Sequence, residues 1–364
     1  MLLKVATRVL ALGGLLALGC DSAVTPALTP MPDAAVPPDG PAAMDQTLTP
    51  PPAGQGFQFK TMSSQVAAGT EVQDCYFFQV PGAPTDEVYV NRVTIAQNVG
   101  THHLNVFRVK TIKGLDPAMG YVHGENGMGE CFKSPNWADW PLVSNSQSDG
   151  KEVDWKLPEG VANRFQGGDW LMIQSHFVNG RTQATPFRAH AEVNFWTTEK
   201  SKVTAELGTL FATNQSVRIC KSTPTPSFDK TCHAKGDVKI IAANGHFHGR
   251  GKEFAMYSWD GTSTAKPPET ARFYTSNSWD DPPMSRDLTV AVPNGGGIWY
   301  TCDFQWQEPP VGCDKLNAID KAKGTPDELL DCCYRFGGLV DENEHCNAFV
   351  YYYPKTAETD VFCN

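Results

Sequence analysis

Six of the nine histidines stand at spacings that suit a metal site. His246 and His248 form an H-x-H motif, and on a β-strand the period of two would point both imidazoles to one face. His102 and His103 are adjacent, so both can reach one ion only where the backbone bends. Imidazole suits both oxidation states of copper as well as zinc, although neither pair decides the matter alone. The six candidate ligands are His102, His103, His176, His246, His248 and His345.

The segments that must position these histidines alternate in polarity as β-strands do. The expected strands are residues 88–95, 169–176, 189–196, 238–243 and 348–353. One short helix is expected at 325–330, where Thr325 can cap it and Pro326 suits its first position. The body from residue 57 is too long for one small sandwich, and the polar run 197–202 interrupts the strands. The sequence therefore predicts an all-β protein with two tandem antiparallel β-sandwich domains, 57–200 and 201–364.

The order of the histidine motifs resembles the copper type II, ascorbate-dependent monooxygenases, the family of peptidylglycine alpha-hydroxylating monooxygenase and dopamine beta-monooxygenase. That family has a T-H-H run, a later single His on a strand, an H-x-H pair and a terminal segment with Cys followed by tyrosines. Here these are the run 101–103, then His176, the pair 246–248, and Cys346 before the strand 348–353. The resemblance covers nearly all of residues 57–364 and implies jelly-roll-like sandwiches side by side, one copper on each, facing an open cleft.

The resemblance also implies roles for individual residues. His102, His103 and His176 would bind an electron-transfer copper in the first sandwich, and His246 and His248 an oxygen-binding copper in the second. Ascorbate or another donor would reduce the two coppers, and O2 would be used to hydroxylate an activated C–H bond of a small-molecule or peptide substrate. The chemistry needs no catalytic side chain beyond the copper ligands. The disulfides implied by the resemblance are Cys302–Cys346 and Cys75–Cys131.

Three positions depart from the family pattern. His345 stands where the family has a methionine ligand, and we expect it to be the third ligand of the second copper. Asn244 replaces the arginine that holds a peptide carboxylate, and Phe349 replaces a tyrosine, so the substrate stays open. The residues expected to line the substrate site are Asn244, Asn347, Phe349 and Tyr351.

Two other functions remain open from the sequence. Because histidine replaces the family's methionine at position 345, one alternative is a copper-binding lipoprotein without enzymatic turnover. Such a protein would capture metal or bind a partner. Alternatively His246, His248 and His345 could form a zinc site with an open fourth position, as hydrolytic zinc sites do.

The amino terminus has the pattern of an export signal. Lys4 and Arg8 precede an apolar run that ends in small residues before Cys20, and residues 1–19 resemble a bacterial lipoprotein signal with Cys20 as the lipidated residue. An ordinary secretory signal ending near Gly19 is the alternative. Residues 20–56 contain nine prolines and no Lys or Arg, which predicts a disordered tether. We therefore expect a protein of the bacterial cell envelope, facing the periplasm or the cell surface and bound to the membrane by lipid alone.

The cysteine count agrees with export. Eleven Cys leave ten after Cys20 is assigned to lipid, enough for five disulfides in an oxidising compartment. The neighbours Cys332 and Cys333 should have different partners, and Cys220 and Cys232 could close the Pro/Ser/Thr loop between them. A zinc–thiolate site is disfavoured because no C-x-x-C motif occurs. Four cysteines have no assigned pairing, namely Cys313, Cys332, Cys333 and Cys363.

Charge and motif content exclude other classes. The net charge of −10 and the absence of a Lys/Arg block argue against nucleic acid as a partner, and we expect a monomer. The sequence has no G-x-S-x-G, P-loop or H-E-x-x-H motif, which weakens hydrolase and nucleotide readings. The other three histidines, His123, His190 and His233, are expected at the surface.

Overall fold

The computed structural model describes residues 45–110, 118, 120–122, 140–148, 150–180, 187–309, 331–355 and 361–363. In these ranges the regular structure is almost entirely β-strand, and the 3-10 turns η4 (Lys200–Lys202) and η5 (Glu269–Ala271) lie beside it. The expected all-β class is therefore confirmed. The expected helix at 325–330 lies outside the described residues. Among the described residues no helix is long and apolar enough to span a membrane.

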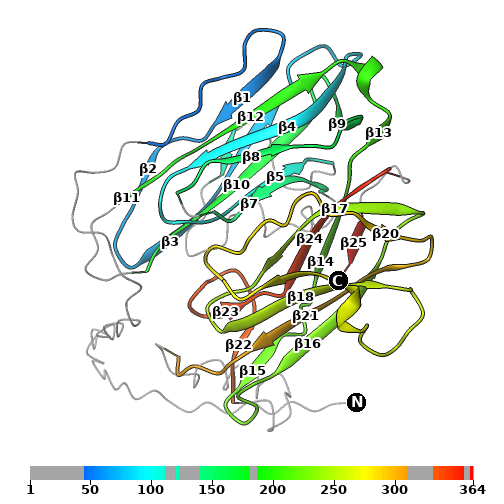
Figure 1. Cartoon of the computed structure of the whole chain (residues 1–364). Coiled ribbons are helices and arrows are strands. Elements are labelled where there is room, and N and C mark those ends of the chain that lie inside the picture. The colour runs from blue at the N-terminus through cyan, green and yellow to red at the C-terminus, as the bar shows by residue number, and fades with distance from the viewer. Residues whose placement is uncertain are drawn as a thin grey trace, which may run out of the picture.

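Two mainly antiparallel sheets form the first half of the molecule, the upper half in Figure 1. Sheet I has the order β1 (Gly56–Lys60), β12 (Ala191–Thr198), β4 (Glu87–Gln97), β9 (Val161–Gln166), β13 (Ala205–Glu206), with β8 (Val153–Lys156) also on β4. Sheet II has the order β6 (Tyr121–Val122), β3 (Thr70–Gln79), β10 (Trp170–Asn179), β5 (Thr101–Arg108), β7 (Leu142–Ser146). A short pair, β2 (Ser64–Val66) and β11 (Phe187–Ala189), lies beside them.

The second half repeats this plan. Sheet III has the order β20 (Val290–Val292), β17 (Val238–His246), β24 (Asn347–Tyr353), β14 (Gly208–Thr213), β25 (Val361–Cys363). Sheet IV has the order β16 (Ser227–His233), β21 (Gly297–Phe304), β18 (Gly251–Trp259), β19 (Arg272–Ser276). A three-stranded sheet of β15 (Arg218–Cys220), β22 (Cys332–Phe336) and β23 (Asn343–Glu344) carries the segment before β24. The five strands expected from the sequence are confirmed as β4, β10, β12, β17 and β24, each within a few residues of its expected range.

Three apolar clusters explain how the sheets stack. One, including Val93, Leu104 and Phe195, fills the space between sheets I and II, and a second, including Phe254 and Tyr300, fills the space between sheets III and IV. A third cluster draws on both halves, joining Phe107 and Met172 of sheet II to Ala242, Phe349 and Tyr351 of sheet III. Sheets II and III are thus covered on both faces, and the two sandwiches share a buried interface.

The expected domain boundary near residue 200 falls slightly too early. η4 does interrupt the strands there, but β13 then pairs in parallel with β9 and still belongs to sheet I. The first strand of the second sandwich, β14, begins at Gly208.

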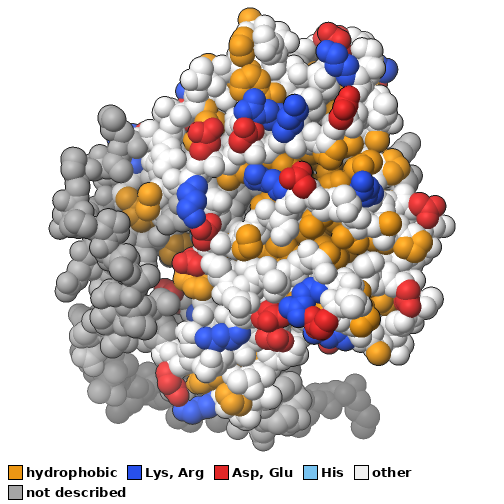
Figure 2. All heavy atoms as spheres, viewed as in Figure 1, with side chains coloured by type: hydrophobic (Ala, Val, Ile, Leu, Met, Phe, Trp, Pro, Cys, Tyr) orange, Lys and Arg blue, Asp and Glu red, His pale blue; other side chains and the backbone are white. Residues whose placement is uncertain are grey.

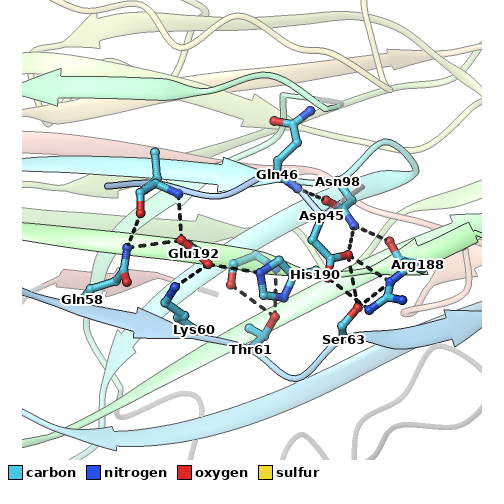
Figure 3. A network of polar contacts seen from close by, with 12 residues as sticks. Asp45, Gln46, Gln58, Lys60, Thr61, Ser63, Asn98, Arg188, His190 and Glu192 are labelled. Atoms are coloured by element: carbon cyan, nitrogen blue, oxygen red, sulfur yellow. Dashed lines mark hydrogen bonds and ion pairs between the residues drawn. The ribbon is translucent and has the colours of Figure 1, made fainter. Parts of the chain in front are cut away.

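The last part of the expected tether is folded onto the first sandwich. Leu48 is buried, and its backbone N–H donates to Glu192 Oε2 at 2.7 Å (Figure 3). Asp45 forms an ion pair with Arg188 and accepts a hydrogen bond from Asn98. The expectation of disorder is therefore wrong for residues 45–49, because polar partners on β12 and the β4–β5 turn bind them. The earlier part of the expected tether lies outside the described residues.

This covering segment also corrects the expectation for His190. The side chain is only 7% exposed and lies against Glu192, whose carboxylate also pairs with Lys60 at 2.8 Å (Figure 3). Residues 45–49 cover what would otherwise be the solvent face of β12, so His190 is buried. His233 is exposed as expected, and His123 lies outside the described residues.

The disulfides confirm part of the cysteine predictions. Cys302–Cys346 forms as the resemblance implied. The expected Cys220–Cys232 link is wrong, because Cys220 pairs with Cys332 and Cys232 with Cys363. Cys220 and Cys332 are register partners on neighbouring strands, which brings together residues far apart in the chain. Cys75 and Cys333 are disulfide-bonded as well, so the neighbours 332 and 333 do have different partners; Cys131 lies outside the described residues.

The exposed face in Figure 2 shows Lys, Arg, Asp and Glu side chains interspersed, with hydrophobic side chains gathered across its middle. No single-sign charged patch dominates this face.

Candidate metal centre

Strand periodicity places the histidine motifs on the faces where the sandwiches meet. On β5, Leu104 and Val106 point into the first sandwich core, whereas Phe107 belongs to the interdomain cluster. His103 and Asn105 have the same parity as Phe107, so they face the second sandwich. On β10, residues 172, 174 and 176 have the same parity, so Gln174 and His176 face the second sandwich as Met172 does. The apolar part of this interface continues directly into a polar, histidine-rich part.

A β-bulge solves the problem posed by the adjacent pair. His176 pairs with His103 and Phe177 with Thr101, which leaves His102 as an extra residue on β5. The bulge lets both imidazoles approach His176, with ring centroids 5.1 Å (His102) and 5.0 Å (His103) from it. The bend that the sequence required is therefore present.

Gly100 starts the turn into this bulge. Its φ of 93° lies in the left-handed region that favours glycine, and a Cβ there would meet the Phe187 ring at 2.3 Å. A larger residue would push the turn away from Phe187 and shift His102 with it.

The nitrogens of the first set face one another at metal-ligand spacing. His176 Nδ1 lies 3.3 Å from His103 Nε2. Two nitrogens bound tetrahedrally to one ion at about 2.0–2.1 Å are roughly 3.3 Å apart. The other nitrogen of His176, Nε2, donates to Glu71 Oε2 at 2.8 Å, which leaves Nδ1 as the ligand atom.

The second set is built from strand ends. His246 is the last residue of β17, His248 follows it, and His345 stands between β23 and β24. His246 Nε2 lies 3.1 Å from His345 Nδ1, and the rings of His248 and His345 are 4.5 Å apart. His248 Nδ1 donates to the Asn343 carbonyl at 2.9 Å, so its Nε2 is left for an ion.

A buried ion pair holds these strand ends together. Glu344 accepts from the backbone N–H groups of His248 and Arg250 at 2.9 and 3.0 Å and from Arg250 Nε at 2.6 Å. Both partners are almost fully buried, and burial raises the pKa of Glu344. The Cys302–Cys346 disulfide fixes the residue next to His345.

The two sets are in contact, which corrects the expected open cleft. The His102 ring lies 4.8 Å from that of His246 and 5.2 Å from that of His248, and His103 lies 5.3 Å from His246. Among the described residues, two groups of three histidines have ligand nitrogens within 4.8 Å of one another, and His102 belongs to both. The physical reason is the shared apolar interface, which brings sheets II and III together and closes the space between the histidines.

The donor set fits a transition metal that takes imidazole ligands. Neither ring nitrogen of His102, and not Nε2 of His248, has a hydrogen-bond partner among the described residues, although both side chains are buried. Buried polar atoms without a partner are rare and costly, and an ion would satisfy them. Burial lowers the pKa of His102, His103, His246 and His248 well below the usual value, and lowers that of His345 to about 3. The imidazoles are therefore neutral, as ligation requires.

The residues expected to line the substrate site are engaged elsewhere. Asn244 and Tyr351 are buried and hydrogen-bonded to Asn145 of the first sandwich, and Phe349 stacks on Phe211. Asn347 is buried too, and its Oδ1 has no partner among the described residues. Substrate could touch Asn244, Phe349 or Tyr351 only if the two halves separated.

Sequence reasoning missed three contributors to the site. Glu71 bonds to His176, Gln147 bonds to His246, and the Trp279 ring lies 6.0 Å from that of His102. None of them stands in a motif with a histidine, so only the strand pairing and the closed interface reveal them.

The fold and site define a protein of two β-sandwiches with a shared histidine cluster. No family model matches the chain. It is similar over part of its length to neuraminidases of influenza A virus, strains A/Chicken/Pennsylvania/1370/1983 and A/Chicken/Pennsylvania/1/1983 (H5N2), each 28% identical over 116 residues. That stretch is 30% of this chain and 24% of each neuraminidase, so the chain spans about a quarter of the length of these relatives. A partial match of this kind shows no family for the chain.

Proposed function

We propose that the protein is a copper-dependent monooxygenase that hydroxylates an activated C–H bond of a small-molecule or peptide substrate, using O2 and a reductant such as ascorbate. The observation that carries the proposal is His102, a buried imidazole with no hydrogen-bond partner for either nitrogen among the described residues, surrounded by histidines of both sandwiches. The motif order that resembles the copper monooxygenases supports copper as the metal.

The residues of this chain would hold the metal and keep its ligands oriented. All six candidate ligands are imidazoles, and copper bound by them supplies one-electron redox chemistry toward O2. Glu71 and the Asn343 carbonyl each accept a ring N–H from a histidine, so that the opposite nitrogen keeps its lone pair. The closed interface keeps bulk water away from the cluster, which limits side reactions.

A pocket beside the cluster offers a path for substrate. It measures about 760 Å³, and its lining includes Trp279, Ser276 and Asp280. Because the Trp279 ring also lies against His102, only the Trp279 side chain would separate a substrate in this pocket from His102.

A second function, copper binding without turnover, is favoured by a different observation. Five of the six histidines are less than about a tenth exposed, and the two halves meet over them. A centre that never opens could store or transfer copper but could not bring substrate to it.

The proposed location is the cell envelope, with the chain anchored through Cys20. Three disulfides among the described residues support an oxidising compartment. Cys20 lies outside the described residues. If it is acylated, Cys20→Ala should release the protein from the membrane fraction or block its maturation. A Cys20→Ala protein that still fractionates with membranes would rule the anchor out.

One set of measurements separates the functions. We expect purified protein to bind copper, to show type II copper signals by electron paramagnetic resonance, and to consume O2 with ascorbate in a substrate-dependent way. Copper signals without O2 consumption would support the binding function instead. A protein that takes up zinc and gives no copper signal would rule out both. The His102→Ala variant serves as the control for binding at the cluster.

A further inference from the structure

One glutamine of the first sandwich reaches the histidines of the second. Gln147 directly follows β7 and is 3% exposed. Its Oε1 accepts a hydrogen bond from His246 Nδ1 at 2.8 Å, and its Nε2 donates to Asn244 Oδ1. Both partners are on β17 of sheet III, so this one side chain crosses the interface between the two halves.

The orientation of the glutamine amide is fixed by its surroundings. The Asn244 Nδ2 group donates to the backbone carbonyls of Pro282 and Pro283 at 3.3 and 3.2 Å. Carbonyls only accept, so the NH2 end of Asn244 must face them and Oδ1 must face Gln147. Gln147 must then present its NH2 group to Asn244 and its oxygen to His246.

A second contact agrees with this assignment. Asn145 Nδ2 donates to the same Asn244 Oδ1 at 3.0 Å, and Asn145 Oδ1 accepts from the Tyr351 hydroxyl. The side-chain amides of Asn145, Gln147 and Asn244 thus have one consistent set of orientations, because flipping any one of them would place two donors or two acceptors face to face. With Gln147 Oε1 facing it, His246 Nδ1 must carry the proton.

We propose that Gln147 is a positioning residue that holds His246 in its Nδ1–H tautomer, leaving Nε2 free to bind the metal. His246 Nε2 is the atom that faces His345, at 3.1 Å. The first sandwich thereby sets the ligand atom of a histidine in the second, and full metal affinity of the second set depends on contact between the two halves. The inference rests on the proposed metal-binding function.

The tautomer can be read in the metal-free protein. With histidines labelled with 15N, nuclear magnetic resonance of wild-type protein should show His246 as the Nδ1–H form. A His246 in the Nε2–H form would overturn the proposal without any variant. Because this measurement involves no metal, it is independent of whether copper binding itself is found.

Variants then test whether Gln147 is the cause. Gln147→Met keeps the size but removes the acceptor, so His246 should become a mixture of tautomers and its set should lose copper affinity by about 10–100-fold. Gln147→Glu restores an acceptor and should restore the Nδ1–H form. A Gln147→Met protein with an unchanged tautomer and unchanged copper affinity would contradict the proposal.

Gln58→Met is the matched control. Gln58 is also a glutamine of the first sandwich, and its amide donates to the Leu48 carbonyl at 3.0 Å and to Glu192 Oε2 at 3.2 Å, but none of its hydrogen bonds in the described structure goes to a histidine. Its replacement should lower stability while leaving the His246 tautomer and the copper affinity as in wild type. Equal effects of the two replacements would mean that Gln147 acts only through packing, against the proposal. If Gln147→Met does not fold, the wild-type tautomer still decides whether His246 is held in the Nδ1–H form.

Discussion

The two histidine sets of the cluster are positioned by different means. In the first sandwich, His103 and His176 are register partners on β5 and β10, in the interior of a five-stranded sheet. In the second, His246, His248 and His345 stand at or beyond strand ends and are held by side chains and a disulfide. Backbone ladders fix the first set, whereas a few buried polar contacts fix the second.

The difference indicates where the centre is easiest to disturb. In a β-sheet the backbone hydrogen bonds of many residues hold a strand in place, so one side-chain substitution disturbs it little. Where a single buried ion pair holds the structure, loss of one partner removes most of the stabilising free energy. We therefore expect single substitutions to damage the second set more than the first. His102 is the exception, because it lies in the first sandwich and contacts both sets.

The largest effect is expected at the buried ion pair. Arg250→Met leaves the Glu344 carboxylate buried without its cation, which should lower the free energy of unfolding by about 3–5 kcal/mol and disorder the second set. Thermal or denaturant unfolding together with copper content measures both effects. Arg250→Met with Glu344→Gln removes both charges and should recover part of the loss.

The surface replacement Arg272→Met is the control for that experiment. Arg272 pairs with Glu269 and Glu253 near the surface, so its loss should cost at most about 1 kcal/mol. Similar losses for Arg250 and Arg272 would show that the buried pair does not organise the second set.

The next largest effect is expected for His102. His102→Ala should reduce bound copper further than His176→Ala or His345→Ala, because His102 belongs to both groups of histidines, His176 to one and His345 to neither. Copper content per folded protein, with circular dichroism to verify the fold, makes the comparison. Equal copper content in the three variants would show that His102 serves one set only.

A smaller effect is expected from the carboxylate behind His176. Glu71→Leu removes the acceptor of His176 Nε2–H and should weaken copper binding about 10–100-fold, and Glu71→Gln should recover most of the affinity. A copper titration against a competing chelator measures it. Glu87 is a carboxylate that pairs with Lys200 and Arg164 away from the cluster. The control variant Glu87→Leu should therefore leave the copper affinity unchanged. Loss of affinity in both variants would point to a general charge effect.

The smallest change in occupancy is expected for His345→Met. Copper should stay bound, but the thioether favours Cu(I), so the reduction potential should rise and X-ray absorption of the reduced protein should show a sulfur neighbour. Wild-type protein that already shows a copper–sulfur neighbour would remove His345 from the ligand set. So would a His345→Ala variant that keeps its full copper content.

The sequence predicted those parts of the site that depend on local pattern. The H-x-H spacing predicted that His246 and His248 point to one side, and their ring centroids are 5.3 Å apart. The adjacent pair at 102–103 implied a bend, which the structure supplies as a bulge. All six candidate ligands lie in the one cluster.

Tertiary packing decided what the sequence could not show. Glu71 and Gln147 reach histidines more than ninety residues away, and neither position has a local signal. The Pro/Ser/Thr loop between Cys220 and Cys232 suggested a link between them, but β15 pairs with β22 and brings Cys220 to Cys332 instead. Covering of β12 by residues 45–49, and closure of sheet II onto sheet III, likewise depend on surfaces that meet only after folding.

The proposed metal centre contains histidines of both sandwiches, joined through His102. Anomalous diffraction at the copper edge, on crystals of the copper-loaded protein, would locate the metal among them. We expect copper bonded to His102 together with at least one histidine of the second sandwich. Copper bound separately by the two halves across an open cleft, with His102 contacting none of His246, His248 and His345, would contradict it.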